Sequence, residues 1–223
     1  MLRYIRTIIG PSNRLPKPIF ADFVGIVFTS LPPVTLIGVT FAAVGILVAA
    51  KERDLIVSGV VVLGMAVTAG RILLILAYRR KARVEGIQDP VPWERRYALG
   101  AYSFAIVLGA FNLRAIVLGD PLITMLITSV MFGYGAGIVA RLAVRPTTCV
   151  ISLALAVVPT CAGYVIYAAT ADDYYVTAIY ICQAVLLLAF AAAGTEAWDI
   201  STGPRFSNSS PARTLQCLRG RTL

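Results

Sequence analysis

The sequence contains no histidine, and only 14% of its residues carry a charge. Without histidine, the chain lacks the side chain most often used as a general base, the commonest protein ligand for metals and a frequent axial ligand of haem iron. It also has no Walker loop and no Ser-His-Asp set. We therefore expect no enzymatic activity, no cofactor and no bound metal in this chain.

Cysteine is scarce too: the four cysteines are Cys149, Cys161, Cys182 and Cys217. Three of them fall inside apolar runs, and none forms a C-x-x-C pair. Cysteine in such surroundings behaves as a small apolar residue. We expect buried apolar cysteines rather than disulfides or metal ligands.

Apolar residues are in excess, at 58% of the chain. They gather in runs of about 20, the length that a helix needs to cross roughly 30 Å of hydrocarbon. We expect helices at about 34–50, 55–78, 97–113, 122–140, 149–169 and 176–193. The predicted fold is all-α, with a six-helix membrane domain over 20–194, a basic cytoplasmic N-terminus over 1–19 and a disordered cytoplasmic tail over 195–223.

The basic residues indicate how these spans are oriented. The stretch from Arg79 to Tyr97, predicted as a loop between the second and third spans, holds six of them: Arg79, Arg80, Lys81, Arg83, Arg95 and Arg96. Of the twenty Lys and Arg residues, three lie in predicted outer loops and Arg71 lies inside a span, which leaves sixteen on the other side. The positive-inside rule then places both termini in the cytoplasm.

The net charge of +9 would suggest a nucleic-acid partner in a soluble protein. Because the basic residues here flank apolar spans, we assign them to topology and to contacts with lipid head groups. The expected partner is the lipid bilayer, and no nucleic acid is expected to bind.

Arg71 is the one charged residue well inside a predicted span. An arginine within hydrocarbon is unfavourable unless it pairs or reaches the interface. It lies about two turns, roughly 10 Å, from the cytoplasmic end of its span, a distance that a long side chain can largely cover. Two interpretations stay open: Arg71 extends to the interface, or it is a buried functional residue.

The fourth predicted span carries Gly133, Gly135 and Gly137 in the sequence FGYGAG. A GxGxG run also occurs in nucleotide-binding loops, but here no strand precedes it and no acidic partner follows it. Small residues in an apolar helix allow neighbouring helix backbones to approach closely. We expect these glycines to serve helix packing.

Three segments carry a family resemblance: WERRYALGAYSFAIVLGAF (Trp93–Phe111), GYGAGIVARLAVRP (Gly133–Pro146) and ADDYYVTAIYICQAVLLLAF (Ala171–Phe190). With ADFVGIVFTSLPP (Ala21–Pro33), they resemble, in the same order, the N-terminal multi-helix membrane region of proteobacterial diguanylate cyclases. These are GGDEF proteins, often joined to an EAL phosphodiesterase. The resemblance covers roughly residues 21–193, and none of its motifs is catalytic.

The resemblance implies a sensor or anchor in the bacterial inner membrane. In that family it holds a cytoplasmic GGDEF domain that condenses two GTP into cyclic di-GMP, usually as a dimer with Mg²⁺. A homodimer and a cytoplasmic signalling partner are therefore implied here. The sensing or packing candidates are Arg71, Trp93, Arg95, Arg96, Gly133, Gly135, Gly137 and Arg141.

The chain departs from the family pattern after its last span, because no GGDEF, EAL or coiled-coil linker follows. Two accounts of residues 195–223 stay open: a frameshifted form of a lost linker and cyclase start, or the end of a stand-alone module that acts on a separate protein. Two other functions also stay open, a small six-helix transporter or channel and a membrane partner subunit.

Overall fold

The computed structural model describes residues 31–84, 91–139 and 146–202, and the regular secondary structure in these ranges is entirely helical. The helices are α3 (Leu31–Glu52), α4 (Leu55–Val84), α5 (Val91–Val117), α6 (Pro121–Val139), α7 (Pro146–Thr170) and α8 (Tyr174–Thr202). All six are long and apolar enough to cross a membrane, which confirms the predicted all-α fold with six membrane-spanning helices. The predicted N-terminal segment over 1–19 and the chain beyond Thr202 lie outside the described residues.

The helices extend beyond the predicted spans where charged residues begin. Much of the basic stretch predicted as a loop is helical, because α4 continues through Arg83 and α5 begins before Arg95. α8 likewise continues through Thr202, past residue 195, where the disordered tail was predicted to begin. The prediction ended each helix where hydrophobicity ends. In α4 the added turns are rich in arginine and lysine, which are good helix formers, and cations near a helix C-terminus interact favourably with its dipole.

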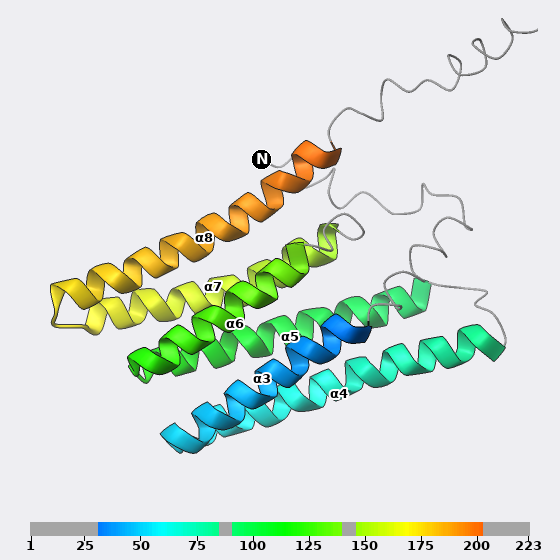
Figure 1. The fold of residues 1–223 in the computed structure, drawn as a ribbon, viewed down its shortest axis with the longest axis horizontal. Coiled ribbons are helices and arrows are strands. Elements are labelled where there is room, and N and C mark those ends of the chain that lie inside the picture. Colours follow the sequence, from blue (N-terminus) through cyan, green and yellow to red (C-terminus); the bar gives the residue numbers. More distant parts are fainter. Residues whose placement is uncertain (1–30, 85–90, 140–145, 203–223) are drawn as a thin grey trace, which may run out of the picture.

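The six helices form three antiparallel hairpins, α3–α4, α5–α6 and α7–α8, whose short turns lie at one end of the bundle (Figure 1). In the second turn, Gly119 has a φ of 82°, a conformation that glycine adopts without strain. Each turn also contains an aspartate that begins the next helix. Asp54, Asp120 and Asp173 each accept backbone N–H bonds from residues two or three positions further on.

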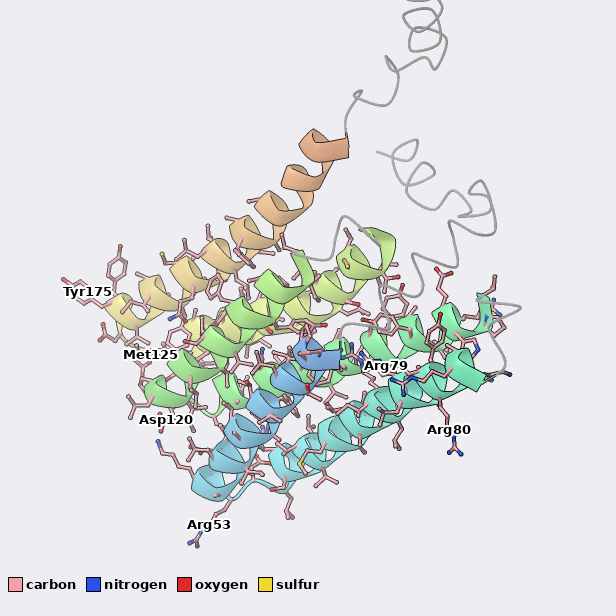
Figure 2. All side chains as sticks on the ribbon, turned by 45° about the vertical axis from the view of Figure 1, so that its right-hand side comes forward. Arg53, Arg79, Arg80, Asp120, Met125 and Tyr175 are labelled. Carbon is pink, nitrogen blue, oxygen red and sulfur yellow. The ribbon has the colours of Figure 1, made fainter. Side chains whose placement is uncertain are left out.

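Two ion pairs join the first turn to the second. Arg114 donates hydrogen bonds to Asp54 from Nε (3.1 Å) and Nη2 (2.5 Å), and Lys51 donates to Asp120. Figure 2 shows Asp120 at the end of the bundle opposite Arg79 and Arg80. The bundle therefore has a strongly basic end and an end where cations pair with aspartates.

These ion pairs predict a loss of stability in acid. Hydrogen bonding to Arg114 lowers the pKa of Asp54 below its ordinary 3.8, and hydrogen bonding to Lys51 lowers the pKa of Asp120 in the same way. A carboxyl group whose pKa is lower in the folded state stabilises the fold above its unfolded pKa, and this contribution disappears as the pH falls through the folded value.

We therefore expect the thermal midpoint in neutral detergent to fall as the pH drops below about 4. Asp54→Asn and Asp120→Asn should each show a smaller acid-induced fall than the unmodified chain. Asp172→Asn removes an exposed carboxylate of the third turn and is the matched control. Identical acid profiles for all four proteins would contradict the assignment.

The core is centred on α5, which packs most extensively against α7. Phe41 of α3 meets two buried rings of α5 edge-on, with centroids 5.6 Å from Phe104 and 5.3 Å from Phe111. Asn112 of α5 is fully buried and donates to the Thr160 hydroxyl of α7 at 3.2 Å. Hydrogen bonds between helices in a bilayer stabilise by about 1 kcal/mol and fix which faces meet.

Candidate ligand cavity beside Arg71

A cavity of about 450 Å³ lies between α3 and α6, and residues of α4, α5 and α7 complete its wall. This volume falls in the range of about 300–1,000 Å³ that is typical of small-molecule sites. Most of the wall is apolar. Its polar side chains include Thr40, Arg71, Tyr97, Ser129, Tyr134, Thr148 and Ser152. Arg71 is the charged residue on this wall, and no described acidic residue lines it.

Arg71 reaches this cavity from α4 by crossing α5. Its Cζ lies 5.4 Å from the ring centre of Phe104 and 6.0 Å from that of Tyr97, both on α5. Gly100 lies between these rings in the sequence, and a Cβ there would come within 2.9 Å of Arg71 Cγ. Gly100 thus makes room for the arginine stem. The guanidinium of Arg71 therefore lies against α5 within the bundle. Of the two interpretations of Arg71, this position differs from the one in which the side chain extends to the membrane interface.

Two hydrogen-bond donors on the cavity wall lack partners. Nε of Arg71 is buried, and so is the hydroxyl of Ser152, a residue that is only 2% exposed. Neither atom has a hydrogen-bond partner among the described residues. An unpaired buried donor is unfavourable by about 1–3 kcal/mol, and by more when it is charged. Both atoms are covered by neighbouring protein atoms, so an occupant of the cavity would reach them only after a local side-chain movement.

The cavity opens on the outer face of the bundle, between α3 and α6. Leu36 of α3 lines the cavity and is 69% exposed, while Ser129, Gly133 and Gly137 line it from α6 and are also exposed. In helices that cross a membrane, such exposed positions face lipid. The cavity therefore opens sideways toward the bilayer.

The structure divides the three glycines of α6 between two faces. A Cβ at Gly135 would come within 2.6 Å of Phe190 of α8, so this glycine permits close helix contact. Gly133 and Gly137 line the cavity, and a Cβ at either position would meet nothing within 4 Å among the described residues. Among the described residues, therefore, Gly135 makes a close helix contact, whereas Gly133 and Gly137 border open space.

Three further sequence candidates, Trp93, Arg95 and Arg96, are not among the residues that line the cavity. The Trp93 ring packs edge-on against Tyr78 with centroids 5.5 Å apart, and the guanidinium of Arg96 lies 5.6 Å from the centre of the Trp93 ring. Arg95 is exposed. Arg141 falls in 140–145, outside the described residues. Trp93 and Arg96 thus belong to the packing of the basic end.

Sequence reasoning found Arg71 but missed Ser152 and Tyr97 as members of the same site. A polar residue in an apolar span is a usable signal for Ser152. Nothing in the sequence shows that α7 places it on the same cavity as Arg71 of α4. The described residues contain no group of three His, Cys, Asp or Glu side chains that could hold a metal ion.

Comparison of the chain with protein-family models, with curated proteins and with solved structures found no match. The cavity and the arrangement of the helices around it are therefore the basis for any functional assignment, together with the sequence resemblance described above.

Proposed function

We propose that this chain is the membrane sensing and anchoring region of a cyclic di-GMP signalling system. In this proposal the bundle lies in a bacterial inner membrane with both termini in the cytoplasm, and the chain itself has no catalytic role. The resemblance to the membrane regions of diguanylate cyclases supports the signalling assignment. The basic end of the bundle supports the orientation.

The structural observation that carries the proposal is the position of α6 between the cavity and α8. One face of α6 lines the cavity through Gly133 and Gly137. Another face contacts α8, where Phe132 and Phe190 meet edge-on with centroids 5.2 Å apart. Near the basic end, a Cβ at Gly194 of α8 would come within 2.6 Å of Val139 of α6. A displacement of α6 at the cavity would reach α8 through these contacts, although α8 packs more extensively against α7.

α8 is suited to carry such a displacement out of the membrane. Its apolar span covers Tyr174–Gly194, and the helix continues to Thr202. The interface between α3 and α6 is much less extensive than the interface between α5 and α7. We therefore expect the α3–α6 interface to change its packing more readily than the α5–α7 interface. In this mechanism an occupant of the cavity stabilises one arrangement of α6, and α8 transmits the shift in population to a cytoplasmic partner.

The cyclic di-GMP assignment is tested in the gene. Sequencing from the codon for Ala193 through several hundred bases past the codon for Leu223 tests the frameshift account, which predicts a GGDEF-encoding frame in another phase. The intact mass of the expressed protein is the accompanying measurement. Absence of that frame, with a mass that matches 223 residues, would remove the cyclase link and leave only resemblance.

The same purified chain separates the proposal from its alternatives. A sensor region alone is expected to give neither solute flux in liposomes nor GTP turnover. Solute flux through the reconstituted chain would favour a transporter or channel. Stable co-purification with a larger membrane protein that has no signalling domain would favour a partner subunit.

A further inference from the structure

We propose that the Arg71 cavity binds an amphiphile that has a singly charged anionic head group and an alkyl chain, and that enters from the bilayer between α3 and α6. Only the idea that this ligand is a signal rests on the proposed function. The binding itself is inferred from the cavity wall, so the two can fail separately.

The positive charge on the cavity wall favours an anionic ligand. Arg71 is the charged group on the wall, and no ion pair among the described residues involves it. Its contacts there are with the faces of Phe104 and Tyr97, which balance only part of a buried positive charge. A charged group inside a membrane is unfavourable unless it is paired, and a guanidinium pairs best with a carboxylate or a phosphate.

The hydrogen-bonding groups also suit an anionic head group. The buried Nε of Arg71 and the buried hydroxyl of Ser152 are donors without partners among the described residues, and both residues line the cavity. Thr148, another residue with a hydroxyl group, lines the same wall. An oxyanion accepts several hydrogen bonds at once, so a head group paired with the guanidinium can also satisfy the two buried donors once a local side-chain movement uncovers them.

The remainder of the wall suits an alkyl chain. Leu36, Ile37, Leu126, Val130 and Ile138 supply apolar surface from α3 and α6, the two helices between which the cavity opens. A volume of about 450 Å³ exceeds what a bare head group needs. The lateral opening lets a long chain continue into the bilayer. The site therefore fits an amphiphile better than a water-soluble anion.

This chemistry is found in two sources, a free long-chain fatty acid and an anionic phospholipid. We would measure both with the purified full chain in nanodiscs of phosphatidylcholine, which has no net charge. The probes are palmitate, hexadecanol as its uncharged counterpart and phosphatidylglycerol, with bound molecules detected by native mass spectrometry. Palmitate and phosphatidylglycerol are expected to bind or compete, and hexadecanol is expected to bind at least about tenfold more weakly.

Variants locate the binding in the cavity. Arg71→Gln should weaken palmitate binding by about tenfold or more, because it removes the charged donor, while Arg71→Lys keeps part of the affinity. Gly133→Leu should block the cavity without a clash. Gly70→Leu is its matched control, since Gly70 also has open space around its Cβ position and does not line the cavity.

The outcomes divide as follows. Palmitate binding without competition from phosphatidylglycerol identifies a free fatty acid, and effective competition identifies a bilayer lipid; either result supports the site. Equal binding of hexadecanol and palmitate would overturn the proposal. So would palmitate binding that survives both Arg71→Gln and Gly133→Leu in variants that remain folded.

A second measurement separates binding from signalling. In a variant without native cysteines, Val139→Cys and Gly194→Cys place a thiol pair on the contact between α6 and α8. If palmitate binds but leaves the rate of cross-linking unchanged, the site stands and the sensor mechanism fails. If no anion binds, the inference about the ligand fails, whatever the contact between α6 and α8 does.

Discussion

Replacing Gly109 with leucine is expected to abolish the contact between α5 and α7 and to destabilise the bundle by about 3 kcal/mol or more. A Cβ at this position would lie 2.9 Å from the carbonyl oxygen of Leu155, 3.0 Å from Pro159 Cγ and 3.2 Å from the carbonyl oxygen of Ala156. Two of these three atoms belong to the backbone, which cannot move aside as the end of a side chain can. Even alanine should therefore be destabilising here.

The proline explains why the contact is so close. Pro159 lies inside α7 and has no N–H, so the Leu155 carbonyl loses its usual helical partner. Gly109 lies beside that carbonyl, because a Cβ on this glycine would be 2.9 Å from its oxygen. Asn112 and Thr160 form a hydrogen bond between the same two helices. The glycine, the proline and the amide thus form one packing unit.

The measurement is the unfolding of the purified chain in mixed micelles of increasing denaturing detergent. Gly59→Leu is the matched control, because a Cβ at Gly59 meets nothing within 4 Å and the residue is exposed on α4. We expect the control to unfold close to the unmodified chain and Gly109→Leu to express poorly or unfold much earlier. Equal stability of the two variants would show that the α5–α7 contact is not the centre of the fold.

Much of the fold could be predicted because lipid imposes a simple rule on sequence. Each span must be apolar over about 20 residues, and runs such as 55–78 satisfy this without help from the rest of the chain. The ends of the helices were predicted less well, because the prediction relied on hydrophobicity alone. Hydrophobicity stops at Tyr78 and near Gly194, whereas α4 and α8 continue into polar sequence.

The site could be predicted only in part, because a cavity depends on how several helices pack against one another. Arg71 was identifiable as a charge in an apolar span, yet its direction depends on the space that Gly100 provides on another helix. Gly133 and Gly135 are two residues apart and look equivalent in sequence. Residues two positions apart in an α-helix point in directions that differ by about 200°. Gly133 therefore borders the cavity, whereas Gly135 meets α8.

Because Gly133 and Gly135 lie on different faces of α6, leucine at these two positions is expected to have opposite effects on stability and on ligand binding. Gly135→Leu should displace the Phe190 ring, because a Cβ would lie 2.6 Å from its Cε1 atom. We expect a destabilisation of about 1–3 kcal/mol, less than at Gly109, since the atom that must move is the end of a side chain. Binding of palmitate in the cavity should be largely retained.

Gly133→Leu should have the reverse profile. Its side chain would extend into the cavity without meeting a neighbour, so we expect stability within about 0.5 kcal/mol of the unmodified chain. Palmitate binding should fall by about tenfold or more, because the leucine occupies ligand space. Detergent unfolding and native mass spectrometry on the same two variants measure both quantities.

The pair is informative because each variant is the control for the other. Both add the same side chain to the same helix, so differences in helix propensity and in hydrophobicity cancel. If both variants lose stability equally, α6 has no free face and the cavity is filled by protein. If both lose ligand equally while remaining folded, the contact between α6 and α8 shapes the site. Opposite profiles would establish α6 as the element that separates the ligand site from the helix that leaves the membrane.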